Sequence, residues 1–247
     1  MMNKTLIATL LTTCALAACS KPTQNAEVNT ATPEAKVASS AEIDSAHNAQ
    51  NSLDWAGDYQ GILPCADCEG IETSLFLQKD GTWVMNQRYQ GAKEPSSFAT
   101  YGTWARTAEK LVLTDTAGEK TYFRAKGEGM EMLDREGNPI ESQFNYTLAP
   151  VKAALPATPM AMRGMYFYMA DAATFTDCAT GKRVAVANNA QLERDYAAAR
   201  GTDTRPVLLV VEGHFTLEAN PDSGAPVNVL AVDSPGKFYQ KEDCNSR

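Results

Sequence analysis

The feature that most constrains this chain is a series of short, alternating apolar runs within residues 54–149, each followed by a turn signal. Such alternation over four to eight positions is typical of half-buried β-strands. The dipeptides Asp80-Gly81, Ala117-Gly118 and Gly137-Asn138 stand between successive runs and favour tight hairpins. We therefore predict eight strands, near residues 57–61, 73–78, 83–89, 101–106, 111–114, 120–124, 130–134 and 143–148.

Successive hairpins form an up-and-down meander, and eight strands are enough to close such a meander into a barrel without an unpaired edge. A barrel of this size is either filled by side chains or holds one small ligand. The inward-facing candidates are apolar: Leu75, Leu77, Trp83 and Met85. These side chains either pack as a solid interior or line a cavity.

A second folding unit is predicted for residues 162–247, after a linker at residues 150–161 that contains Pro150, Pro156 and Pro159. Proline removes backbone donors and favours a semi-rigid extended connection. The strands predicted for this unit are residues 163–169, 174–178, 182–187, 207–218 and 227–232.

A helix is predicted between the third and fourth of these strands. Asn188 or Asn189 can cap its start, and Gly201 can adopt the left-handed conformation at its end. One apolar stripe follows its length: Leu192, Tyr196 and Ala199. Five strands with a helix after the third have the order of an OB-fold. The predicted fold class is therefore all-β, with an eight-stranded barrel followed by an OB-fold barrel with one helix.

The charge balance excludes several functions. The chain has 22 Lys and Arg against 30 Asp and Glu, a net charge of -8, and only two histidines, His47 and His214. An acidic surface repels nucleic acid, so we predict that the OB-fold domain faces protein instead. Two imidazoles cannot build a three-histidine zinc site, and no histidine or nucleophile stands beside the paired carboxylates. We predict no enzymatic activity.

The N-terminus predicts export. Lys4 precedes an apolar stretch that is too short to span a bilayer permanently, so residues 1–18 are interpreted as a signal peptide. The motif Leu16-Ala17-Ala18-Cys19 resembles the bacterial lipobox, which implies lipidation of Cys19; the alternative is an ordinary signal peptide with a chance cysteine. By resemblance to the lipoprotein sorting rule, Ser20 indicates the outer membrane. Residues 19–53 contain almost no large apolar side chains and are predicted to be a flexible tether.

Several stretches together resemble one known family. Besides the lipobox, they are residues 57–68 (GDYQGILPCADC), residues 165–171 (MYFYMAD), Asp177-Cys178, and residues 211–215 (VEGHF) through to Cys244. On these residues the chain resembles the NlpE/CutF family of copper-homeostasis and envelope-stress lipoproteins of enteric bacteria. The resemblance implies a lipocalin-like barrel followed by an OB-fold domain, and activation of the sensor kinase of the Cpx pathway.

Of the six cysteines, four are expected to remain available in the mature protein, because Cys14 is removed with the signal peptide and Cys19 carries lipid. The remaining four are Cys65, Cys68, Cys178 and Cys244. In an oxidising compartment they are expected to form disulfides, with three possible connectivities. The domain division favours pairing within each unit, Cys65 with Cys68 and Cys178 with Cys244, and the family resemblance implies the same.

The Cys65-Ala66-Asp67-Cys68 motif has three interpretations. Redox catalysis needs a thiolate stabilised by cations or a helix N-terminus, whereas Asp67 and Glu69 disfavour a thiolate here. In the reduced form Cys65 and Cys68 could bind Cu(I), which suits the family's association with copper. The remaining interpretation is a labile disulfide that closes a loop. No cofactor is expected to be required, with Cu(I) as a possible ligand.

Four methionines and one histidine offer further candidate metal ligands. The sulfurs of Met160, Met162, Met165 and Met169 would suit Cu(I). Packing is the preferred interpretation, because Met165, Phe167 and Met169 alternate along a strand and are expected to face a core. His214 is expected to be a hydrogen-bonded strand residue.

We expect a non-enzymatic lipoprotein, anchored by lipid in the outer membrane and facing the periplasm. It would sense surface contact, lipoprotein trafficking or redox and copper stress. Its expected partners are the periplasmic domain of the Cpx sensor histidine kinase and the lipoprotein export machinery. The alternative is a lipocalin-like carrier of a small apolar ligand or a Cu(I)-binding protein, and a packed first barrel would favour signalling.

Overall fold

The computed structural model describes residues 55–91, 96–107, 109–187 and 189–246. The predicted signal peptide, the lipidation site Cys19, His47 and the whole predicted tether lie outside the described residues. Within the part of the chain that is described, no helix combines the length and apolarity needed to cross a bilayer. Both domains described below belong to one compact unit of the chain, Gln50–Arg247.

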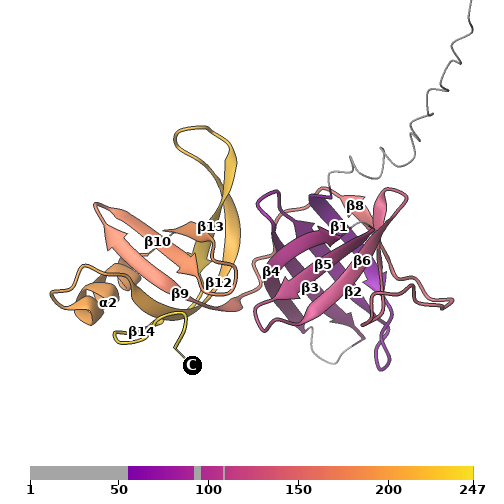
Figure 1. Cartoon of the computed structure of the whole chain (residues 1–247), viewed down its shortest axis with the longest axis horizontal. Helices are drawn as coiled ribbons and strands as arrows, with labels where there is room; N and C mark the ends of the chain where they lie inside the picture. Colours follow the sequence, from indigo (N-terminus) through magenta and orange to yellow (C-terminus); the bar gives the residue numbers. More distant parts are fainter. Residues whose placement is uncertain (1–54, 92–95, 108, 188, 247) are drawn as a thin grey trace, which may run out of the picture. The chain divides into compact units, whose positions relative to one another are not determined.

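The first domain is a closed barrel of eight antiparallel strands, each paired with its neighbours along the chain (Figure 1). The last strand pairs with the first and closes the barrel, so the predicted meander is confirmed. The strands are β1 (Gly57–Leu63), β2 (Gly70–Leu77), β3 (Thr82–Gln90), β4 (Ser97–Thr107), β5 (Lys110–Asp115), β6 (Lys120–Lys126), β7 (Gly129–Met132) and β8 (Thr147–Val151).

The eighth strand differs from its prediction. β8 begins at Thr147 instead of residue 143 and includes Pro150, which lies opposite Tyr59 of β1. Before it, the chain bonds to its own side chains: Phe144 N donates to Ser142 Oγ at 3.1 Å, and Thr147 N donates to the side chain of Asn145 at 3.0 Å. These local bonds form turns and compete with strand pairing, so the strand starts only after them.

The interior of the first barrel is filled by side chains. Leu75, Leu77, Trp83 and Met85 are all buried there, with exposed fractions between 0% and 7%. They pack with side chains from the other strands and from the start of the domain: Trp55, Tyr59, Leu63, Leu111, Leu113, Phe123, Met130 and Leu148. Of the two interpretations open from the sequence, the described residues support the packed interior over a ligand cavity.

The second domain is an OB-fold barrel, as predicted. Its strands are β9 (Met160–Met169), β10 (Ala172–Asp177), β11 (Arg183–Ala187), β12 (Val207–Ala219), β13 (Pro226–Val232) and the short β14 (Lys237–Tyr239), which the sequence did not indicate. The order β9-β10-β11-β13-β12 closes because β12 also pairs with β9. β11 and β13 are parallel, and the other pairs in this barrel are antiparallel.

Helix α2 (Ala190–Arg200) lies between β11 and β12, where a helix was predicted. Its apolar stripe is confirmed, since Leu192 and Tyr196 are buried and Ala199 packs against the same core. Asn189 occupies the N-cap position but makes no side-chain capping bond. Gly201 has a positive φ of 60°, although its ψ of -125° lies outside the left-handed helical region.

The prediction for the face of β9 was wrong by one residue. Met160, Met162 and Tyr166 face the core and are at most 3% exposed, whereas Met169 is 63% exposed. The alternation is set at Gly164, where an added Cβ would lie 2.5 Å from the ring of Phe175. The even-numbered residues from Met160 to Tyr166 therefore point inward, and Met165 and Met169 do not take the core positions expected of them. Phe167 still packs against the core cluster, as predicted.

A pH-dependent contribution to stability is expected from Glu131. A hydrogen bond from Lys126, helped by Arg124, holds the pKa of this carboxyl below its ordinary value of 4.5. A carboxyl with a lowered pKa stabilises the fold above that ordinary value and loses its contribution as the pH falls through the folded-state pKa.

We therefore expect Glu131→Gln to lower the free energy of unfolding by roughly 0.5–1 kcal/mol at pH 7, which is the range that partly exposed ion pairs contribute to stability. Below pH 4.5 the loss should become progressively smaller. Urea unfolding at pH 7 and at acidic pH measures this, with exposed Glu128→Gln as the control. A difference that stays constant with pH would contradict the assignment.

Candidate functional site

The first candidate site is the loop between β1 and β2, which carries the CxxC motif. Cys65 and Cys68 are joined by a disulfide, and their Cα atoms lie 5.3 Å apart. Glu69 N donates to the carbonyl oxygen of Gln90 at 3.2 Å and ties the loop to the end of β3. The disulfide thus sits at one end of the barrel, outside its packed interior.

The surroundings of this disulfide are apolar and acidic. A hollow of about 490 Å³ beside it is lined by Pro64, Cys65, Ala66, Asp67, Cys68, Ile71, Tyr89, Ser96 and Phe98. Phe98 is 56% exposed, and its ring meets the ring of Tyr89 edge-on at 6.0 Å. Among the described residues that line the hollow none is a cation, and the loop leads into a strand. A thiolate at Cys65 would therefore lack the stabilisation that redox catalysis needs.

The donor set for a metal is small. Among the described residues, no group of three or more His, Cys, Asp and Glu side chains is placed to hold a metal ion. The two sulfurs of Cys65 and Cys68 are bonded to each other, so they become ligands only after reduction. Two thiolates on one loop would then suit a soft cation of low coordination number.

The second candidate site is the disulfide between Cys178 and Cys244, whose Cα atoms lie 5.2 Å apart. Cys178 directly follows β10, and Cys244 lies in the C-terminal segment after β14. Cys178 N donates to the carbonyl oxygen of Arg163 on β9 at 2.9 Å. The bond therefore fixes the end of the chain to the OB-fold barrel.

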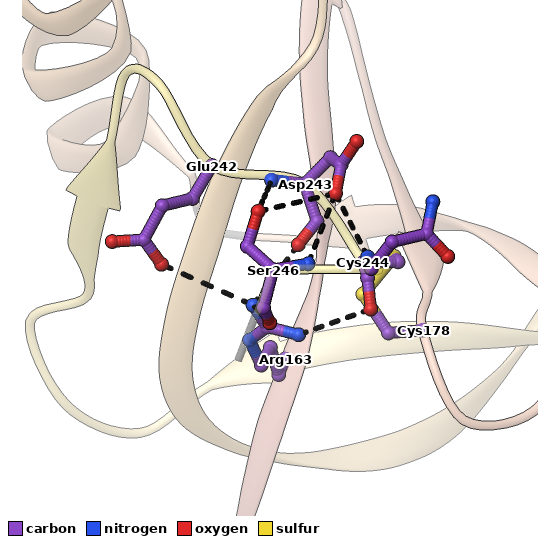
Figure 2. Close-up of polar contacts among 7 residues, drawn as sticks. Arg163, Cys178, Glu242, Asp243, Cys244 and Ser246 are labelled. Carbon is purple, nitrogen blue, oxygen red and sulfur yellow. Dashed lines mark hydrogen bonds and ion pairs between the residues drawn. A yellow bond between two sulfur atoms is a disulfide. The ribbon is translucent and has the colours of Figure 1, made fainter.

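Arg163 binds this C-terminal segment from β9 (Figure 2). Its guanidinium donates to the carbonyl oxygens of Asp243 at 2.9 Å, Cys244 at 3.3 Å and Ser246 at 2.7 Å, and lies 3.9 Å from the carboxylate of Glu242. Arg163 was not predicted as a site residue, because a lone arginine in a strand carries no sequence signal of its distant partners. The disulfide and Arg163 hold the same segment by independent means.

Asp243 orders the last turn of the chain. Its carboxylate accepts hydrogen bonds from the backbone N–H of Asn245 at 2.8 Å and of Ser246 at 3.1 Å. These bonds, with those from the Ser246 hydroxyl and the charge of Arg163, lower the pKa of Asp243 below its ordinary value. The turn around Cys244 is thus held by an ionised carboxylate at neutral pH.

His214 behaves as expected from the sequence. It lies on β12, and its Nδ1 is 2.8 Å from Oδ2 and 3.0 Å from Oδ1 of Asp233. The partner Asp233 follows β13 and could not be identified without the β12–β13 pairing. This hydrogen bond ties β12 to the residue that follows β13, and neither residue belongs to a group of three or more potential metal ligands among the described residues.

Two family models match this chain. The model described as the NlpE N-terminal domain matches residues 59–143, and the one described as the NlpE C-terminal OB domain matches residues 156–245. Together they cover most of the first barrel, without β8, and the second barrel, and they contain the four cysteines of the two described disulfides.

The chain is also similar to known proteins. It is 70% identical over 209 residues to Lipoprotein NlpE of Escherichia coli (strain K12), covering 83% of this chain and 89% of that protein. A crystal structure of the Cpx pathway activator NlpE from Escherichia coli is 72% identical, covers 77% of this chain and 99% of that chain, and has a TM-score of 0.40. A putative lipoprotein from Shewanella oneidensis is 36% identical, covers 42% of this chain and 95% of that chain, and has a TM-score of 0.37.

Proposed function

Because this chain belongs to the NlpE family of lipoproteins, we propose that it is a lipid-anchored activator of the Cpx envelope-stress pathway. The 70% identity to Lipoprotein NlpE of Escherichia coli is the observation that carries the proposal. The direct partner is the periplasmic domain of the Cpx sensor kinase. The protein acts by contact and not by catalysis.

The packed interior of the first barrel supports a role in binding a protein partner over a role in carrying a small apolar ligand. Leu75, Leu111 and Phe123 are fully buried among the other interior side chains, in the space that a lipocalin-like carrier would leave for its ligand. What the barrel offers to a partner is therefore its outer surface and its loops.

The anchor is a lipidated Cys19, delivered to the outer membrane by the lipoprotein export machinery. The motif Leu16-Ala17-Ala18-Cys19 and the following Ser20 support this placement. A protein held in the outer membrane is kept away from a kinase in the inner membrane. Failure of export leaves the protein beside the kinase and turns a trafficking defect into a signal.

The experiment that tests this function places the protein in the inner membrane. We expect Ser20→Asp to raise transcription from a Cpx-dependent promoter several-fold, because the first barrel then reaches the kinase. Ser20→Ala is the matched control and should give the resting output. Fractionation confirms the location of each variant, and an inner-membrane Ser20→Asp protein that leaves the output unchanged would overturn the proposal.

We also propose that copper is a second signal to this protein, through binding of Cu(I) to the CxxC motif. The reduced Cys65 and Cys68 offer two thiolates that suit Cu(I), and the disulfide excludes it. In an anaerobic titration we expect the reduced protein to bind one Cu(I) that is lost in Cys65→Ala/Cys68→Ala, and the oxidised protein to bind none. Equal binding by the reduced variant and the reduced parent would place the copper site elsewhere.

A further inference from the structure

Three large apolar side chains lie in a row on the outer face of the first barrel. Phe76 of β2 is directly opposite Val84 of β3, and Val84 is directly opposite Tyr101 of β4. Their sequence neighbours Leu77 and Trp83 point into the barrel, so the row must point outward. An outer face in water is usually polar, yet Phe76, Val84 and Tyr101 are only 4%, 2% and 4% exposed.

The OB-fold barrel covers this row. The three residues belong to the same core cluster as Met160, Met162 and Val211 of the second domain, and not to the interior cluster of their own barrel. The ring of Phe215 on β12 meets the ring of Tyr101 edge-on at a centroid distance of 5.5 Å. The row therefore forms the apolar centre of an interface within the chain.

One hydrogen bond fixes this interface at its centre. The Tyr101 hydroxyl donates to Oδ1 of Asp177 at 2.7 Å, and Asp177 is only 3% exposed. The other oxygen, Oδ2, accepts from Thr180 N at 2.7 Å, Thr180 Oγ1 at 2.8 Å and Ala179 N at 3.1 Å. Burial, followed by the charge and the hydrogen bond of Asp177, raises the pKa of Tyr101. The next residue, Cys178, links the loop that holds Asp177 to the second disulfide.

The edge of the interface is polar and incompletely closed. Lys182 Nζ donates to the carbonyl oxygen of Asp80 at 2.5 Å, and the side chain of Asn228 bonds to that of Gln78. Beside the row, a cleft of about 550 Å³ is lined from both domains, and Leu217 at its border is 55% exposed. An apolar centre with a polar, partly open edge is typical of interfaces that separate, not of a single domain core.

We propose that the OB-fold barrel is a releasable cover over the Phe76–Val84–Tyr101 row, and that this row is the face with which the first barrel binds the sensor kinase. The proposal rests on the function proposed above and names its contact surface. The partner must offer what the cover offers: an apolar surface with a hydrogen-bond acceptor for Tyr101. While the cover is in place, the contact face is buried.

The cover is tested with Phe215→Glu, which places a charge against the row from the second domain and leaves the row intact. Hydroxyl-radical footprinting of the soluble full chain, with Cys19 replaced by alanine, reports the exposure of each ring. We expect oxidation of Tyr101 to rise at least fivefold in Phe215→Glu. Tyr59, which is buried inside the first barrel, should be unchanged. Unchanged oxidation of Tyr101 in a folded variant with both disulfides would overturn the cover; if that variant does not fold, Phe215→Ala provides the same comparison.

The contact face is tested in cells that carry the Ser20→Asp form. Val84→Glu should abolish its kinase output, because the charge lies within the row, whereas Phe215→Glu should raise the output further. Ile62→Glu, on an outward position of β1 that is 50% exposed, is the matched control and should leave the output unchanged. Full output from folded Val84→Glu would overturn the contact face. Loss of output already in the parent Ser20→Asp would instead refute the proposed function.

Discussion

Replacing Cys178 and Cys244 with alanine should lower the free energy of unfolding of the oxidised protein by about 4 kcal/mol, whereas replacing Cys65 and Cys68 should lower it by only about 2 kcal/mol. The difference follows from loop size, because the bonded residues are 66 positions apart in the first case and 3 in the second. A bond that closes a longer loop removes more conformational entropy from the unfolded chain.

Urea unfolding of the two double variants beside the parent protein measures this ranking. The double substitutions leave no unpaired thiol, so disulfide exchange cannot obscure the result. Equal losses for the two variants would contradict the loop-size argument. A loss of about 4 kcal/mol is a large part of a small domain's stability, so we also expect Cys244→Ala to raise kinase output in cells.

Replacing Cys19 with alanine should release the protein from membranes into the soluble periplasmic fraction. The expectation follows from the lipobox-like motif that ends at Cys19. Each buried CH₂ of an acyl chain contributes about 0.8 kcal/mol to membrane binding, so several chains on one cysteine hold a protein firmly, and their loss removes that attachment.

The matched control for this release is Cys14→Ala, because Cys14 lies within the predicted signal peptide and is expected to be removed with it. It should leave the protein in the outer membrane fraction. A Cys19→Ala protein that still fractionates with outer membranes would show that the anchor lies elsewhere.

Local sequence patterns were sufficient to predict both barrels. The apolar alternation and the turn dipeptides around Gly81, Gly118 and Gly137 identified the meander, because strand period and positive φ are local properties; these glycines have φ between 79° and 85°. The start of β8 was predicted too early. The turns that the side chains of Ser142 and Asn145 form with the backbone delay the strand, and they do not show in the apolar pattern of the sequence.

The misassigned features depend on tertiary contacts. The inward face of β9 is decided at Gly164 by the ring of Phe175, which comes from the neighbouring strand. Arg163 contacts residues about 80 positions away, and the bond from Tyr101 to Asp177 joins two domains across 76 positions. Single-sequence patterns contain no information on such partners, so these parts of the candidate site required coordinates.

We propose that the first barrel carries the contact with the Cpx sensor kinase. This contact is tested most directly by deleting residues 55–148 from the Ser20→Asp form and measuring Cpx-dependent transcription, after fractionation confirms that the shortened protein resides in the inner membrane. We expect no activation above the resting level, although the OB-fold domain and its Cys178–Cys244 disulfide remain. Activation equal to that of the full-length Ser20→Asp protein would place the contact surface in the second domain and rule out the first barrel as the part that binds the kinase.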